Sequence, residues 1–180
     1  MAAIQRGGWD VVVLQQGPSA LDASRAELLD LAERFAVEIR KVGAQPALYA
    51  VWPESARFVV FDRVTESYRL AAEHVRGIFL PAGDAWRAAW RRDPSLALYG
   101  RDAFHPSVLG TYVAALVIYE RLSGRSPVGL PARLRSRGGV LIDIAPATAR
   151  LVQEAAHEAN ALSVIGEPSP GARRTNSAPP

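Results

Sequence analysis

Asp102 and His105 stand three residues apart just before an apolar segment, and they are residue types that activate a hydroxyl nucleophile in hydrolysis. A histidine takes the proton of an attacking serine, and a carboxylate beside it fixes the histidine tautomer and stabilises the imidazolium ion that forms. A turn that leads into a helix can direct both side chains to one place, and Pro106 suits the first turn of such a helix. The spacing indicates two members of a catalytic triad.

Structural roles would explain the same two residues. Asp102 could cap the following helix or the turn before it, and His105 could be a partly buried histidine satisfied by a local hydrogen bond. A base and its acid without a nucleophile do not decide between catalysis and structure. Spacing alone therefore leaves both interpretations open.

Three short apolar runs precede the pair, and none alternates apolar with polar residues, which is typical of buried parallel strands. They occupy residues 11–14, 47–52 and 77–80. Helical periodicity fills the intervals between them, at residues 21–42 and 61–74. The alternation favours an α/β fold, a three-layer sandwich whose parallel sheet is flanked by helices on both faces. In such sheets, chemistry gathers at the carboxyl ends of the strands.

The rest of the chain is predicted to be mostly helical. The expected helices span residues 84–91, 106–123 and 146–162, and the second ends near Gly124. Trp86 and Trp90, four residues apart on the first of these helices, are expected to pack in the core or at an interface. We expect one α/β domain over residues 1–164. Residues 165–180 are predicted to be disordered, since their proline, serine, glycine and arginine bury little surface.

The composition excludes several classes of protein. The 180-residue chain is 49% hydrophobic and carries a net charge of +3, with Lys41 as its one lysine among 21 basic residues. The arginines are scattered between acids except at Arg133–Arg137, so a solvated loop is favoured there over a nucleic-acid surface. The absence of cysteine excludes disulfides and thiolate sites. The sequence contains no run near the ~20 apolar residues of a membrane span and no signal-peptide pattern.

Neither a metal nor an organic cofactor is expected. A metal site built from Asp84, Asp102 and His105 would need a further ligand, and His74 and His157 lie in predicted helices without a ligand partner at the usual spacing. The sequence also lacks a glycine-rich phosphate-binding motif.

With these residues identified, the chain resembles the SGNH hydrolases, also called the GDSL esterases and lipases, over residues 9–124 and more weakly to Leu162. The most specific part is the block 102–110, which is similar to the late Asp-x-x-His motif of that family and the helix after it. The resemblance implies that His105 is the general base and that Asp102 orients it. It also implies a flavodoxin-like sandwich and a small acyl ester or carbohydrate O-acetyl ester as substrate.

A second match is the segment 9–19, which looks like the strand before the Gly-x-Asn oxyanion motif of the family. Gly17 matches directly, but Ser19 stands where the family usually has asparagine, and its single hydroxyl donor has a shorter reach. Gln15 and Gln16 follow the strand and could face the substrate, although the polarity of an ordinary turn explains them equally well.

A third match, residues 79–86, looks like a strand and turn of a little-characterised SGNH-like branch. Its Gly83 is predicted to line the pocket. Asp84 is expected to cap the short helix that follows.

The resemblance places the nucleophile before the first strand found here, in a Gly-Asp-Ser-like motif. Only eight residues precede Trp9, whereas a βαβ unit needs roughly 30. We therefore expect that the first strand or strands, with the serine loop, are missing. Either Met1 is an internal methionine of a longer protein, which we favour, or the protein is a shortened form of the family. An uncovered sheet edge would make the chain aggregation-prone or dimeric.

The serines that are present are poor substitutes for the family nucleophile. Ser19, Ser55 and Ser107 lie near predicted strand ends or the dyad, and none occupies a Gly-x-Ser-x-Gly elbow. We expect an SGNH-like serine ester hydrolase that has little or no turnover as it stands. The alternative is a non-catalytic binding or assembly module on the same fold. Expected partners are a small ester or acylated carbohydrate and a second copy of the chain, with neither nucleic acid nor membrane.

Overall fold

A three-stranded parallel sheet forms the centre of the computed structural model, which describes residues 1–164; the predicted disorder at 165–180 lies outside the described residues. Its strands are β1 (Val11–Leu14), β2 (Gln45–Tyr49) and β3 (Ile78–Leu80), in the order β1-β2-β3. Ala47 pairs with Val13 on one side and Ile78 on the other. The predicted α/β class and the three-layer arrangement are confirmed.

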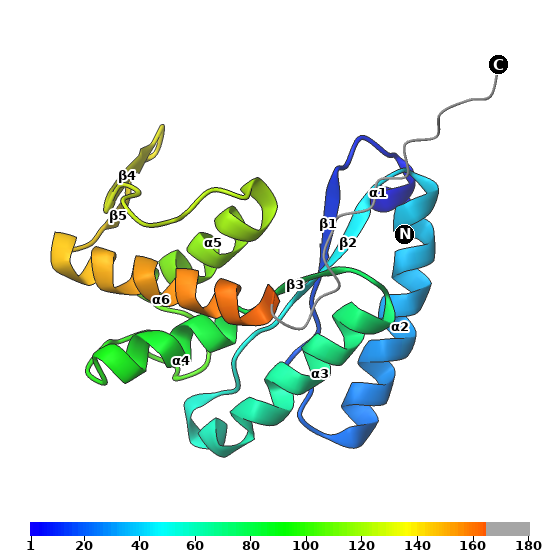
Figure 1. Ribbon diagram of the computed structural model, residues 1–180, viewed down its shortest axis with the longest axis horizontal. Coiled ribbons are helices and arrows are strands. Elements are labelled where there is room, and N and C mark those ends of the chain that lie inside the picture. Colours follow the sequence, from blue (N-terminus) through cyan, green and yellow to red (C-terminus); the bar gives the residue numbers. More distant parts are fainter. Residues whose placement is uncertain (165–180) are drawn as a thin grey trace.

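Helices lie on both sides of the sheet (Figure 1). The first pair is α2 (Asp22–Lys41) and α3 (Phe61–His74). Leu28 of α2 and Tyr68 of α3 pack in one buried cluster with Leu48 of β2. The helices predicted at residues 21–42 and 61–74 therefore both place apolar side chains against the sheet.

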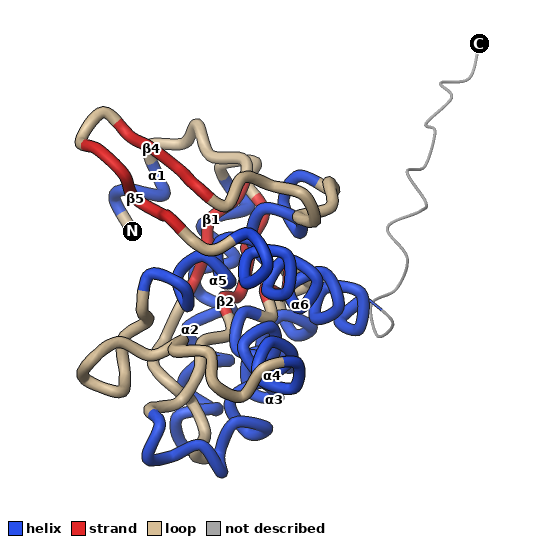
Figure 2. Tube along the Cα trace, turned by 90° about the vertical axis from the view of Figure 1, so that its left-hand side faces the viewer, coloured by secondary structure: helices blue, strands red, loops and turns tan. Residues whose placement is uncertain are grey.

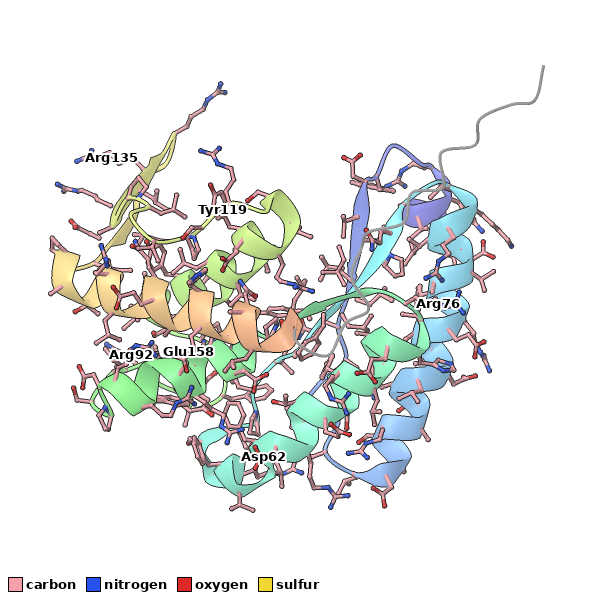
Figure 3. The ribbon with its side chains drawn as sticks, viewed as in Figure 1. Asp62, Arg76, Arg92, Tyr119, Arg135 and Glu158 are labelled. Atoms are coloured by element: carbon pink, nitrogen blue, oxygen red, sulfur yellow. The ribbon has the colours of Figure 1, made fainter. Side chains whose placement is uncertain are left out.

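The second group consists of α4 (Ala82–Arg92), α5 (Val108–Ser123) and α6 (Pro146–Val164). Helix α5 contacts β3, and α4 and α6 pack against α5 and against each other. Figure 3 shows Arg92 and Glu158 side by side where α4 meets α6, and their charged atoms are 2.5 Å apart. Two short helices complete the set, α1 (Ala2–Gln5) and the 3₁₀ helix η1 (Ser55–Val60).

Gly110 shows why the start of α5 is so closely packed. A Cβ atom at this position would lie 2.2 Å from the Leu98 carbonyl oxygen and 2.5 Å from the Trp86 ring, so only glycine fits. The indole of Trp86 donates a hydrogen bond to the Gly110 carbonyl at 3.1 Å. Trp86 is fully buried, which confirms its predicted packing role. These contacts fix α5 relative to the loop that carries Asp102 and His105.

The connection between α5 and α6 differs from the sequence prediction. The arginine-bearing stretch predicted as a solvated loop forms β4 (Arg133–Ser136), which pairs antiparallel with β5 (Gly139–Asp143). Figure 2 shows this hairpin standing apart from the central sheet. Arg133 and Arg135 of β4 are exposed, whereas Ile142 of β5 is half-buried against the core that the helices form. Two strands of four and five residues with arginine at alternate positions of β4 lack the apolar signal used to recognise buried strands.

Two predicted helix starts are also corrected. Helix α4 begins at Ala82, so Asp84 lies in its first turn and accepts from the Thr65 hydroxyl at 2.9 Å instead of capping it. Helix α5 begins at Val108, where the Ser107 hydroxyl caps the backbone N–H of Gly110 at 3.0 Å. Pro106 therefore precedes the helix, because Ser107 supplies the acceptor that a helix N-terminus needs.

β1 is an edge strand within the described sheet, since it pairs with β2 alone. Its Val13 side chain is 44% exposed. A hollow of about 390 Å³ between β1 and α2 is lined mainly by apolar side chains, among them Leu14, Leu31 and Phe35. This hollow lies at the flank of the sheet that no further described strand covers; His105 is not among its lining residues, although Gln15 lines both this hollow and a neighbouring cavity.

Candidate active site

The turn after β1 is fastened by α3. The hydroxyl of buried Tyr68 donates to the Gln16 carbonyl and accepts from the Gln16 backbone N–H at 2.9 Å. It also lies 3.2 Å from the Gly17 carbonyl. The Tyr68 hydroxyl therefore holds Gly17 at the carboxyl end of β1, the edge of the sheet at which α/β proteins bind ligands.

Two loops meet beside this turn, one after β2 and one between α4 and α5. The Ser55 backbone N–H donates to the Ala103 carbonyl at 2.9 Å, and the Trp52 indole donates to the Phe104 carbonyl at 3.0 Å. The Tyr99 hydroxyl donates to the Pro53 carbonyl at 2.6 Å. These three bonds hold the Asp102–His105 loop over the end of β2.

Asp102 and His105 form a direct side-chain pair, with 2.5 Å between Asp102 Oδ2 and His105 Nδ1. The other carboxylate oxygen, Oδ1, accepts the backbone N–H groups of Phe104 and His105 at 3.1 and 2.9 Å. Asp102 therefore caps the turn and orients the imidazole at once. The predicted capping role of Asp102 in the turn is observed, and the same carboxylate lies within hydrogen-bond distance of the imidazole.

The pKa of Asp102 is lowered to about 2, first by the hydrogen bond from His105 and then by the two backbone N–H groups. The carboxylate is therefore ionised at neutral pH. An ionised carboxylate can only accept, so a neutral His105 carries its proton on Nδ1 and leaves Nε2 as a proton acceptor. Nε2 has no hydrogen-bond partner within residues 1–164.

His105 lines a cavity of about 300 Å³ at the carboxyl ends of β1 and β2. Gly17 and Gln15 contribute to the lining from the β1 turn. The remaining lining residues are apolar or aromatic, namely Pro18, Tyr49, Val51, Trp52, Phe104 and Pro106. The structure thus brings the predicted base together with two of the predicted substrate-facing residues.

Three other predicted site residues do not line this cavity. Ser19 is 1% exposed, and its hydroxyl donates to the Gly17 carbonyl at 3.0 Å. Gln16 donates to the Ser24 carbonyl at 3.2 Å and lines the hollow between β1 and α2. Gly83 is buried where a Cβ atom would lie 2.7 Å from the Val51 carbonyl oxygen. Gly83 therefore serves the close approach of α4 to the β2 loop.

The remaining candidate serines have structural contacts. The Ser107 hydroxyl donates to the Ala97 carbonyl at 2.6 Å while it caps α5. Ser55 begins η1 and is exposed. Within residues 1–164, neither serine lines the cavity or forms a hydrogen bond with His105.

The aromatic wall of the cavity was missed by the sequence analysis. Trp52 was predicted to lie inside the second strand, but β2 ends at Tyr49 and Trp52 falls in the loop beyond it. The dipeptide Trp52-Pro53 carried a usable signal, since proline disfavours continuation of a central strand.

Ala103 was missed as well. Its φ of 57° is left-handed, a conformation unusual for a residue other than glycine.

Residues 1–164 contain no group of three or more histidine, cysteine or acidic side chains placed to hold a metal ion. None of the described helices combines the length and the apolar character that a membrane crossing requires.

Comparison with known proteins identifies the fold. No protein-family profile and no curated protein sequence matches the chain. A crystal structure of a DUF4886 family protein from Bacteroides uniformis superposes with a TM-score of 0.68 at 22% identity, covering 88% of this chain and 64% of that protein. The chain therefore spans less than two thirds of that relative's length.

A second solved structure is described as "a putative SGNH hydrolase" from Slackia heliotrinireducens. It superposes with a TM-score of 0.58 at 27% identity, covering 67% of this chain and 70% of that protein. The chain has an SGNH-like α/β fold.

Proposed function

We propose that the chain carries the base and orienter of an SGNH-like serine ester hydrolase acting on acyl or carbohydrate O-acetyl esters. The observation that carries the proposal is the 2.5 Å Asp102–His105 pair at the wall of a cavity beyond the strand ends. The dyad lies at the carboxyl edge of the sheet, where the active sites of α/β proteins are expected. The SGNH-like fold supports it.

The dyad suits proton transfer from a hydroxyl nucleophile. Asp102 holds the Nδ1 proton of His105, so Nε2 can take the proton of an attacking hydroxyl and later return it to the leaving alcohol. The imidazolium that forms in between is stabilised by the ionised carboxylate. The backbone N–H of Gly17, a residue that lines the cavity, is the candidate donor to the oxyanion, because the Gln16 N–H already donates to Tyr68 and Pro18 has no N–H.

The nucleophile is the part of the site that the described residues do not supply. No serine of residues 1–164 lines the cavity. In this proposal, ester turnover by residues 1–180 is weak or absent until a hydroxyl nucleophile is brought to His105 Nε2. Without a nucleophile, hydrogen-bond donors to the oxyanion and a histidine–aspartate dyad support only a modest rate of ester hydrolysis.

A non-catalytic binding module is the second candidate, and one observation favours it. The hydroxyls of Ser19 and Ser107 are both engaged with backbone carbonyls, while the cavity itself is formed and open to ligand. A protein that bound an ester or acylated carbohydrate without cleaving it would need the pocket and no nucleophile.

Hydrolysis of 4-nitrophenyl acetate separates the two candidates. The rate is measured for residues 1–180 and for the product of the reading frame extended upstream of Met1, each with its His105→Ala variant. If the protein is an ester hydrolase, the extended form should hydrolyse the ester. His105→Ala should then lower its rate of hydrolysis by about 10²–10⁴-fold. His157→Ala is the control, because that histidine pairs with Glu120 on helices α5 and α6. If the shorter and the extended forms each hydrolyse the ester no faster than their own His105→Ala variants, the binding module would be favoured.

A further inference from the structure

We infer that the outer edge of β1 is an interface for a second copy of this chain. The β1 strand of the second copy pairs antiparallel with this edge and joins the two three-stranded sheets into one continuous sheet. Each copy uses the same edge, so the interface is symmetric about a two-fold axis and closes as a dimer. The inference is independent of the dyad and of the proposed function.

β1 presents a row of unpaired backbone groups on its outer edge. The Asp10 carbonyl, just before the strand, accepts the Gln45 backbone N–H of β2 at 2.9 Å. Successive residues of a strand turn their backbone groups to opposite edges, so every second residue after Asp10 faces β2. The residues that face outward are Val11, Val13 and Gln15. Within residues 1–164, their backbone groups have no hydrogen-bond partner, which makes this edge a template for another strand.

A strand added at this edge has to place apolar side chains beside α2. The hollow there is lined by Leu31, which is 37% exposed, and by the half-buried Phe35. β1 is itself a strand of the required kind, since its four residues are three valines and a leucine. Val12 and Leu14 point toward α2 and pack in a cluster with it. A two-fold axis perpendicular to the sheet keeps the Val12 and Leu14 side chains of the second copy on the same face, where they fill the hollow.

The row of outward-facing residues indicates the register. In a two-fold pair centred on Val13, the two copies of this residue exchange both of their backbone hydrogen bonds. Val11 of each copy then lies opposite Gln15 of the other, so all three outward-facing residues gain partners. The two Val13 Cα atoms should lie about 5.5 Å apart, as in other hydrogen-bonded antiparallel pairs.

The charges on α2 suit an antiparallel copy of the same helix. Residues 22–31 hold three acids and one arginine, whereas residues 32–41 hold three basic residues and two glutamates. The two-fold axis lays the two α2 helices antiparallel on one face of the joined sheet, so the acidic half of each faces the basic half of the other. Glu27 lines the hollow and forms no ion pair within residues 1–164. In the dimer it meets the half of the second helix that carries Arg34.

The strand pair and the helix pair support each other. A ribbon of two four-residue strands is marginally stable by itself in water. Leu31 lies midway along the stretch of α2 that lines the hollow, so its two copies approach the axis from opposite sides. Removal of their apolar surface from water adds to the backbone hydrogen bonds between the strands.

A single introduced cysteine tests the register directly. The chain contains no cysteine, so a disulfide in a one-cysteine variant joins two copies. A Cα separation of about 5.5 Å is within the range that a disulfide spans. We expect Val13→Cys to form a covalent dimer under mild oxidation, measured on a non-reducing gel.

Val37→Cys is the matched control for this cross-link. Val37 is 50% exposed, against 44% for Val13, and it lines a different hollow together with His74 of α3. Its cross-linking depends on chance collisions, so it should form covalent dimer at least about tenfold more slowly. Equal rates for the two variants would contradict the proposed register.

Two further variants weaken the interface without a cross-link. Residues 1–180 should sediment as a dimer in analytical ultracentrifugation. Val13→Pro removes an outward N–H, at a position where an edge strand tolerates proline, and Leu31→Glu brings like charges together at the axis. Each should raise the dimer dissociation constant at least about tenfold. Val37→Glu, on the same helix, should leave it unchanged. Circular dichroism checks that each variant is folded, and Leu31→Glu decides the test if Val13→Pro is not.

Three results would overturn the inference. The first is a monomer of residues 1–180, and the second is an open-ended aggregate, because a two-fold interface closes. The third concerns the other candidate occupant of the edge, a strand encoded upstream of Met1. If the extended protein is a monomer in which Val13→Cys stays reduced, that segment occupies the edge. These measurements need no ester turnover, so their failure leaves the proposed function untouched.

Discussion

Two histidine–carboxylate pairs in this chain have nearly the same geometry and very different surroundings. His105 Nδ1 lies 2.5 Å from Asp102, and His157 Nδ1 lies 2.6 Å from Glu120. The first pair sits on a loop at the strand ends, whereas the second links α6 to α5. Asp102 is 53% exposed and Glu120 is 15% exposed. Pair geometry alone therefore does not identify the site of chemistry.

The other hydrogen-bond partners of Asp102 and Glu120 distinguish the roles of the two pairs. Both backbone N–H groups that Asp102 accepts belong to the loop that carries His105, so the carboxylate shapes the loop around the ring. Glu120 accepts instead from the buried Asn160 side chain of α6 at 2.7 Å. The first pair orients a histidine beside a cavity, and the second fastens two helices.

Replacing the two carboxylates by their amides should give the largest contrast. In the form of the protein that turns over esters, Asp102→Asn should lower kcat by about 10²–10⁴-fold, because the His105 tautomer is no longer fixed and its cation loses a counter-charge. Glu120→Gln should leave kcat unchanged. Ester hydrolysis at neutral pH measures both. An equal loss in the two variants would mean that the pairs do not differ in function.

The main outline of this contrast was accessible from the sequence. Residue type and spacing placed Asp102 and His105 together, because three residues of one turn are enough to determine their approach. The three parallel strands followed from short apolar runs and the longer helices from apolar periodicity, whereas the β4–β5 hairpin was missed. His157 was placed in a helix without a ligand partner, but its contact with Glu120 depends on how α5 and α6 pack, which no local pattern encodes.

The apolar wall of the cavity could not be derived in the same way. It combines the β1 turn, the end of β2 and the loop before α5, and these segments meet only through long-range bonds such as that from Trp52 to Phe104. Ser19 was considered as an oxyanion donor because it stands where the resembled family usually has asparagine, and a position in the sequence does not give the direction of a hydroxyl. Its bond to Gly17 emerges only from the folded turn.

Removing the buried amide beside the second pair should lower stability without affecting chemistry. Asn160 is 3% exposed and donates to both Glu120 and the Val117 carbonyl. Asn160→Ala leaves these acceptors without their donor, so the free energy of unfolding should fall by about 2 kcal/mol. Urea unfolding followed by circular dichroism measures the loss. In the form of the protein that hydrolyses 4-nitrophenyl acetate, the rate should not change, and a parallel loss of rate would contradict the separation of the two regions.

The backbone beside the first pair should respond in the opposite direction. Ala103 has a left-handed φ of 57°, which disfavours a side chain and suits glycine. Ala103→Gly should therefore raise the free energy of unfolding by up to about 1 kcal/mol. Ala115→Gly is the matched control, because Ala115 is exposed within helix α5. There the same change should lower stability by about 1 kcal/mol. A loss at both positions in urea unfolding would show that the dyad loop is not strained.

The smallest expected effect is the acid response of Asp102, and it follows from the direction of its pKa shift. The folded-state pKa is lowered to about 2 from an ordinary value of 3.8, so the ionised carboxylate stabilises the folded chain. This contribution is complete above about pH 4 and is lost as the pH falls toward 2. Because Asp102 is exposed to screening by solvent, the effect should be modest. Other acids with lowered pKa values, such as Asp93 and Glu158, titrate alike in wild type and Asp102→Asn. The stability difference between the two proteins, measured by urea unfolding, should therefore stay constant from pH 7 to about pH 4 and shrink toward pH 2. A difference that persisted undiminished at pH 2 would mean that the ionised carboxylate does not hold the loop around His105.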